Sequence, residues 1–206
     1  MRWIALMMLV LAGCGNPAPT PLPSPQPAPP SNPSAAPALK MVVFDFDQTL
    51  PTIHVFHKTN GARDATKLND AFFIEAFGGQ SRIDRLRQHL KRLNDAGVRC
   101  VIVSYGFTGV IRECLKRANL SAYFADQDIY GRDSEALISL RGAKHALIAK
   151  LMKSAELNFD AVLFVDDDLR NIEAAAQAKT CRTLHVTNRA GITEAYMSQL
   201  ERAAGR

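Results

Sequence analysis

Apolar residues along this chain follow two spacings. Short continuous apolar runs, such as Met41–Phe44, are typical of strands buried on both faces of a sheet. Longer segments carry apolar residues three or four positions apart, as helices with one buried face do. The strands predicted in this way are residues 41–44, 98–103, 161–165 and 182–186, with a shorter one inside 123–130, and the helices are residues 66–77, 81–96, 110–118, 143–153, 171–178 and 192–203.

The order of these segments predicts the fold class. Strands that alternate with helices favour an α/β fold in which a central parallel sheet carries helices on both faces. We therefore expect a three-layer sandwich of the Rossmann type. Ser81 is expected to cap the helix at 81–96, and Gly97 is expected to end it.

Polar residues follow three of the predicted strands. Asp45 and Asp47 come directly after the first, Ser104 follows the second, and Asp166 and Asp167 follow the strand at 161–165. Ligands of open α/β sheets bind beyond the carboxyl ends of the strands. Because parallel strands end at the same edge, these side chains are expected to meet at one site.

Asp45 and Asp47 repel each other unless a cation or a proton lies between them. A hard metal such as Mg2+, which prefers carboxylate oxygens, meets this requirement. The alternative for this motif taken alone is an ordinary strand that ends in a turn or helix-capping aspartate. The presence of acidic and polar groups at three strand ends favours the metal site.

The same residues support chemistry on a phosphate ester. Asp45 is placed to attack phosphorus and form an aspartyl-phosphate, while Mg2+ offsets the charge of the two approaching anions. Asp47 is placed to protonate the leaving oxygen and then to deprotonate the attacking water. Ser104 is a candidate to hold a phosphate oxygen. Lys144, at the start of a predicted helix, is the best candidate for the cation that balances the remaining charge.

These motifs, in this order and spacing, resemble those of the haloacid dehalogenase-like phosphatases over residues 41 to about 188. The segment around Asp166–Ile172 also resembles the last motif of their small magnesium-dependent members. The resemblance implies that Asp45 is nucleophile and metal ligand, and that Asp47 is acid/base and binds the metal through its backbone carbonyl. It further implies that Thr49 steadies the turn at the phosphate site, that Ser104 and Lys144 hold phosphate, and that Asp166 binds the metal, with Asp167 supporting it or ligating.

The intervals between these motifs are short. Large caps in this superfamily are inserted there, so we expect no cap or a minimal one and an open site. Open sites of this kind often act on macromolecules or borrow a lid from a neighbouring subunit. His54 and His57 lie in the first interval. They are interpreted as packed or surface residues, with metal binding or substrate contact as the alternatives.

The N-terminal segment predicts export. Residues 1–13 resemble a signal peptide, and Leu11–Cys14 resembles the bacterial lipobox, in which the cysteine is lipidated. Residues 14–39 therefore read as lipidated Cys14 and a tether, uncharged and holding ten of the eleven prolines, and residues 40–206 as the phosphatase domain. This predicts a lipid-anchored protein at the cell envelope, on the periplasmic face or the outer membrane. The alternatives are an ordinary cleaved signal and a cytoplasmic enzyme with a mis-assigned start.

Charge and cysteine content narrow the remaining possibilities. The net charge is +5 without a block of Lys and Arg, so no nucleic-acid partner is expected. Besides Cys14 the chain has an odd number of cysteines, Cys100, Cys114 and Cys181, so they cannot all pair in disulfides. Cys100 and Cys181 are expected to pack as small apolar residues.

The leading hypothesis is a Mg2+-dependent phosphomonoester hydrolase anchored at an envelope membrane. The alternative is a catalytically silent module of the same fold that binds a phosphorylated ligand. Asp47 favours the enzyme, because a binding module needs no acid/base at that position. The sequence does not identify the substrate.

Overall fold

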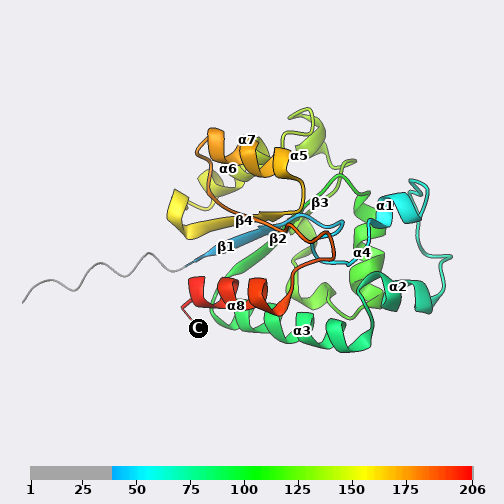
Figure 1. Ribbon diagram of the computed structural model, residues 1–206. Coiled ribbons are helices and arrows are strands. Elements are labelled where there is room, and N and C mark those ends of the chain that lie inside the picture. The colour runs from blue at the N-terminus through cyan, green and yellow to red at the C-terminus, as the bar shows by residue number, and fades with distance from the viewer. Residues whose placement is uncertain (1–38, 206) are drawn as a thin grey trace, which may run out of the picture. The chain divides into compact units, whose positions relative to one another are not determined.

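The computed structural model describes residues 39–205, and within them five parallel strands form one sheet in the order β3-β2-β1-β4-β5 (Figure 1). Chain connection runs from β1 outward to β3, then returns to the other side of β1 for β4. The crevice between β1 and β4 is therefore the point at which such sheets bind ligands. The strands are β1 (Met41–Phe44), β2 (Arg99–Val103), β3 (Ile129–Tyr130), β4 (Val162–Asp166) and β5 (Arg182–His185).

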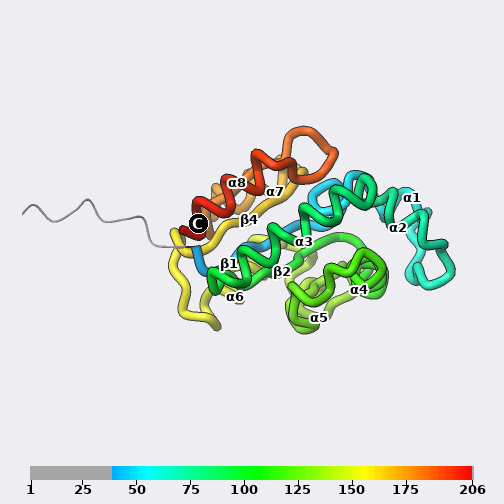
Figure 2. Tube along the Cα trace, turned by 90° about the horizontal axis from the view of Figure 1, so that it is seen from below, coloured from blue at the N-terminus to red at the C-terminus, as the bar shows by residue number. Residues whose placement is uncertain are grey.

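Helices cover both faces of the sheet, which confirms the predicted three-layer α/β sandwich. Figure 1 shows α5, α6 and α7 above the strands and α3 and α8 below them, and Figure 2 shows α3 and α8 lying across the lower face. The helices are α1 (Val55–Lys58), α2 (Asp70–Ala76), α3 (Gln80–Asp95), α4 (Thr108–Arg117), α5 (Glu135–Ile138), α6 (Lys144–Ser154), α7 (Leu169–Gln177) and α8 (Glu194–Ala203).

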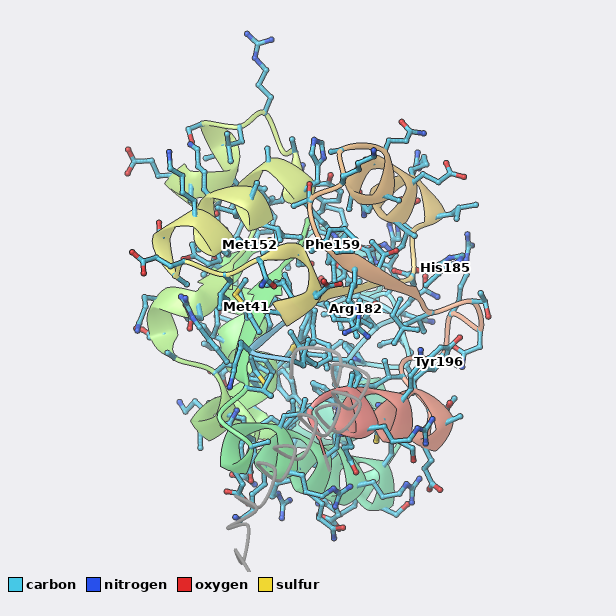
Figure 3. The ribbon with its side chains drawn as sticks, turned by 90° about the vertical axis from the view of Figure 1, so that its left-hand side faces the viewer. Met41, Met152, Phe159, Arg182, His185 and Tyr196 are labelled. Carbon is cyan, nitrogen blue, oxygen red and sulfur yellow. The ribbon has the colours of Figure 1, made fainter. Side chains whose placement is uncertain are left out.

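Alternation along the buried strands divides the core in two. In β1, Val42 and Phe44 face the layer of α3, α4 and α8, whereas Met41 and Val43 face the layer of α5, α6 and α7. Figure 3 views these layers from the side, with Met152 of α6 placed above Met41. Because both faces are covered, the central strands β1 and β4 are apolar along almost their whole length, and β1 is fully buried.

Several boundaries differ from the predictions. The helix expected from residue 66 begins at Asp70, because the side chain of Asn69 accepts the Phe72 N–H and caps it there. The next helix begins at Gln80, so Ser81 is inside it; Gly79, at φ 93°, makes the turn that a side chain would disfavour. The third strand keeps only Ile129 and Tyr130. Two short helices, α1 and α5, were not expected.

The short interval after β1 holds only α1 and α2 before α3 begins, and none of its described residues forms a strand. Both helices lie beyond the carboxyl end of β1 (Figure 1). The expectation of a minimal cap is thus confirmed. Among the helices that the structure describes, none is long and apolar enough to cross a membrane. The predicted signal peptide, Cys14 and all but the last residue of the predicted tether lie outside the described residues.

Candidate active site

A pocket of about 330 Å³ opens at the carboxyl edge of the sheet, over the crevice between β1 and β4. Five residues predicted for the site line it. The other seven come from turns and loops after the strands and from the first turn of α7, and sequence reasoning did not assign them to the site. The pocket is lined by Asp45, Asp47, Gln48, His54, Ser104, Tyr105, Lys144, Asp167, Asp168, Arg170, Asn171 and Arg189.

The turn after β1 brings the two aspartates into this pocket. Asp45 continues the sheet for one more residue, because its N–H donates to Val165 O at 2.8 Å. The chain then turns tightly, with Gln48 in the left-handed region at φ 55° and the Thr49 N–H donating to Phe46 O at 3.1 Å. Asp45 and Asp47 therefore both face the pocket, and both are nearly buried.

Lys144 joins two of the predicted acidic residues. Its Nζ donates to Asp45 Oδ1 and to Asp166 Oδ2, each at 2.8 Å. Burial alone lowers the pKa of the ammonium group, but the charges of the two carboxylates together outweigh burial and hold the pKa above its ordinary value. Lys144 is therefore a permanent positive charge at the bottom of the pocket.

Hydrogen bonds from the backbone and from Asn171 fix the orientation of the Asp166 carboxylate. Its Oδ1 accepts the Asp168 N–H at 2.7 Å, and the Asn171 side-chain amide donates to both of its oxygens at 3.0 and 3.1 Å. Burial and then the charge of Asp45 raise the pKa of Asp166 to about 6. Asn171 was read from the sequence only as part of a motif and the start of a helix. An amide in the first turn of the helix after an acidic strand end was the signal for it.

Three carboxylates form a cluster suited to a metal ion. Oxygens of Asp45, Asp166 and Asp167 all lie within 4.8 Å of one another. The pKa of all three carboxyl groups is raised, and burial is the largest cause in each. A neighbouring carboxylate raises the pKa of Asp166 and of Asp167 further. For Asp45 the second cause is the charge of Lys144, which opposes burial and lowers the pKa. A hard divalent cation relieves this repulsion and prefers such oxygen ligands, so the residues present fit Mg2+.

Asp45 and Asp47 differ in their partners. Asp45 bonds directly to the ammonium of Lys144, whereas Asp47 Oδ1 accepts the Phe56 N–H at 3.3 Å and its Oδ2 lies 3.4 Å from His54 Nδ1. Burial raises the pKa of Asp47, and hydrogen bonds to backbone N–H groups offset this only in part. Environments that separate two carboxyl groups in this way suit one to attack and the other to carry a proton.

The loop after β2 forms the opposite wall. Ser104 is buried, and its Oγ accepts the Gly106 N–H at 3.2 Å before α4 begins at Thr108. A Cβ atom on Gly131 would lie 2.4 Å from Thr108 N, so only glycine allows this close packing behind the loop. Tyr105 OH donates to Gly142 O at 2.9 Å, and the Lys144 Nζ lies 4.6 Å from the centre of its ring.

The predicted residues divide into two groups. Asp45, Asp47, Ser104, Lys144 and Asp167 line the pocket, and Asp166 lies directly beneath it through its bonds to Lys144. Thr49 is fully buried, does not line the pocket, and its hydroxyl has no hydrogen-bond partner among the described residues.

The loops supply pocket residues that the sequence did not reveal. His54, left open as a packed or surface residue, lies on the wall next to Asp47, and burial followed by the charge of His57 lowers its pKa. Arg189 and Arg170 are exposed cations at the mouth. Arg189 lies on the loop after β5, where an isolated arginine gives no pattern to read, whereas Arg170 lies in the first turn of α7, inside the segment that resembles the last family motif.

Comparison with solved structures supports the fold. The HAD domain of the effector protein Lem4 from Legionella pneumophila matches with a TM-score of 0.53 at 14% identity, covering 81% of this chain and 95% of that one, and its inactive mutant matches equally. A structure described as a dehalogenase matches with a TM-score of 0.50 at 13% identity, covering 78% and 90%. Comparison with the curated proteins gives no match.

The model of the haloacid dehalogenase-like hydrolases matches residues 58–179. This match spans more than half of the chain and includes Ser104, Lys144, Asp166 and Asp167, while the turn with Asp45 and Asp47 precedes it. This chain therefore belongs to the haloacid dehalogenase-like hydrolase family.

Proposed function

We propose that this protein is a Mg2+-dependent phosphomonoester hydrolase that acts through an aspartyl-phosphate intermediate. One observation carries the proposal: Asp45, the pair of carboxylates at the end of β4, and Lys144 converge beside Asp47 and Ser104 in one pocket. A site with three clustered carboxylates and a buried ammonium suits an anionic group bound together with a cation.

In the first step an Asp45 oxygen forms a bond to phosphorus while the bond from phosphorus to the ester oxygen breaks. Asp47 gives its proton to the departing oxygen, and its raised pKa favours holding that proton beforehand. Lys144 bonds and orients Asp45, and its positive charge opposes the rise in the Asp45 pKa that burial causes, which favours the ionised oxygen needed for attack.

In the second step Asp47 takes a proton from water, whose oxygen attacks phosphorus as the bond to Asp45 breaks. Inorganic phosphate leaves and Asp45 is regenerated as a carboxylate. Ser104, whose buried side chain lines the pocket, would hold a phosphate oxygen. Asp45, Asp166 and Asp167 would hold Mg2+, which supplies positive charge to the transferring group when bound.

The test is hydrolysis of phenyl phosphate by the full chain, with and without Mg2+, beside Asp45→Asn. The matched control is Asp160→Asn, which alters an exposed aspartate outside the site. We expect Mg2+-dependent release of phosphate that falls by roughly four orders of magnitude in Asp45→Asn and persists in the control. Tight binding of phosphonates without hydrolysis would instead support the silent binding module.

We also propose that the protein is held at the cell envelope through lipidated Cys14, as the resemblance of residues 11–14 to a lipobox suggests. The test is partitioning of the full chain, expressed in bacteria, between detergent and water. We expect it in the detergent phase and expect Cys14→Ala in the aqueous phase. Equal partitioning of the two would contradict lipid anchoring.

A further inference from the structure

Arg189 lies at the mouth of the pocket on the loop between β5 and α8. This loop is hydrogen-bonded to the turn that carries the two aspartates. Gln48 Nε2 donates to Arg189 O at 3.0 Å, the Gly191 N–H donates to Gln48 O at 3.1 Å, and the Ile192 N–H donates to Thr49 O at 2.8 Å. The backbone of Arg189 is thus held at a fixed place beside Asp47.

Arg82 of α3 links the turn after β1 to the loop between β5 and α8 through hydrogen bonds. Its guanidinium donates to Leu50 O at 2.8 Å and to Ile192 O at 3.0 Å. Gly191, at φ 77°, fits closely against it, because a Cβ atom there would lie 2.3 Å from Arg82 Nη2. The loop that carries Arg189 is therefore a built part of the pocket.

Arg189 differs from the other lysine and arginine residues of the pocket in having no carboxylate partner among the described residues. Lys144 is neutralised by Asp45 and Asp166, and Arg170 is paired with Asp168 at 2.7 Å. Within residues 39–205 no carboxylate lies within ion-pair distance of the Arg189 guanidinium. Of the three lysine and arginine side chains that line the pocket, Arg189 alone keeps an uncompensated charge in the described part of the chain.

We propose that Arg189 binds a second anionic group of the substrate, so that the enzyme selects phosphomonoesters that also carry a carboxylate or a second phosphate. This inference rests on the proposed function for the identity of the first anion. A guanidinium presents parallel N–H donors that match either group with two hydrogen bonds. Arg189 is accordingly a specificity-determining residue, while the buried groups act on the ester.

The test measures binding without turnover. Alkylphosphonates of increasing chain length, ending in a methyl group, a carboxylate or a second phosphonate, are titrated calorimetrically into the full chain with Mg2+ at low ionic strength. We expect at least one length with an anionic end to bind about tenfold more tightly than its methyl counterpart. Comparing the two anionic ends shows which second group the site prefers.

The variant is Arg189→Asn, because asparagine tolerates the left-handed backbone at φ 50° and leaves the carbonyl that Gln48 bonds. The matched control is Arg182→Ala, which removes the same charge at the opposite end of β5, the end shown with Arg182 in Figure 3. We expect Arg189→Asn to bring the preference below about twofold and Arg182→Ala to keep it. A melting curve confirms that Arg189→Asn is folded.

Equal affinity for methyl and anionic ends at every length in the unmodified protein would overturn the assignment. A preference that survives in Arg189→Asn would overturn it as well. Hydrolysis of phenyl phosphate is measured separately: if it is absent while Arg189 still confers the preference, the proposed reaction fails and the anion site stands.

Discussion

The charged residues at the floor of the pocket and those at its rim differ in burial and in how their charges are stabilised. The floor, Asp45, Lys144 and Asp166, is at most 5% exposed, and each charge is bonded to a partner of opposite sign. The rim, Arg170 and Arg189, is exposed to solvent. Removing a buried partner leaves a charge that water cannot reach, whereas water and salt screen the rim. We therefore expect changes in the floor to affect folding and chemistry, and changes at the rim to affect selection.

Asp47→Asn is the sharpest test of the chemistry next to the floor. It removes the proposed proton donor, so hydrolysis of an alkyl phosphate should fall by roughly 10²- to 10⁴-fold. The loss of aspartyl-phosphate formation should be smaller for nitrophenyl phosphate, whose leaving oxygen needs less help from an acid. Rapid-quench measurement of the alcohol or nitrophenol released in the first turnover checks this. Equal losses for the two esters would contradict a role in protonating the leaving group.

Lys144→Met breaks the floor itself. Without the ammonium, Asp45 and Asp166 face each other unpaired, which should lower the free energy of unfolding by about 3–5 kcal/mol in the absence of Mg2+. Urea unfolding with a chelator present measures this loss of stability, and added Mg2+ should make the loss smaller. Lys150→Met, an exposed position on the same helix, is the control. Equal stability of the two variants would show that the pair of carboxylates needs no lysine.

Asn171→Ala tests how the floor is oriented. The substitution removes the amide that bonds both oxygens of Asp166, so the Mg2+ concentration for half-maximal activity should rise about 10- to 100-fold. A Mg2+ titration of activity gives the value. Gln177→Ala alters the exposed far end of α7 and should match the unmodified protein. An unchanged titration in Asn171→Ala would mean that Asp166 is held well enough by the backbone.

His89 lies outside the pocket and tests how burial alone makes stability depend on pH. It is fully buried between α3 and α8, its ring bonds Glu201 at 2.7 Å, and its other nitrogen has no partner in the described chain. Burial lowers its pKa below 6.5, although Glu201 opposes this. The folded state therefore binds the proton less tightly than the unfolded state does, so stability is complete above pH 6.5 and falls as the pH decreases through the lowered pKa.

Relative to His89→Gln, the unmodified protein should lose at most about 1.4 kcal/mol of unfolding free energy per pH unit below 6.5. Urea unfolding between pH 8 and pH 5 checks this. The pH dependence of Gln88→Ala, at the exposed position next to His89 on α3, should follow the unmodified protein. Parallel curves for His89→Gln and the unmodified protein would exclude His89 as the titrating group.

Arg170→Ala is the smallest of these changes. The Arg170 side chain is 89% exposed and pairs with Asp168 only two residues away, so its loss should change stability by less than about 1 kcal/mol. Thermal melting at low and high salt measures it. A larger loss that high salt does not reduce would show that rim and floor are not separate.

Strand ends were predictable from the sequence and loop contacts were not. The apolar runs before Asp45, Ser104 and Asp166 indicated both the strands and the edge at which they meet, because parallel strands share that edge. Lys144 was found by the need for a counter-charge near a helix start. Arg189 could not be found, because its place depends on hydrogen bonds to Gln48 and on the packing of Gly191 against Arg82, which connect distant parts of the chain.

The start of the helix expected at Ser81 was predicted wrongly for a related reason. Ser81 had the side chain of a cap, but the backbone of Gly79 made the turn first, and backbone conformation has only a weak sequence signal. The short strand predicted inside residues 123–130 forms only at Ile129 and Tyr130. Residues 121–123 and 126–128 before it form 3-10 turns, and the carboxylate of Asp128 is bonded to Arg99 of the neighbouring strand.

The bonds from Gly191 and Ile192 to the turn at residues 48–49 have a consequence for how the protein is made. The aspartates leave the ribosome early, but the segment that holds their turn in place is made about 140 residues later. The nascent chain therefore carries the reactive residues long before they are arranged for catalysis. A chain that stops before the loop between β5 and α8 would carry the family motifs without a finished site.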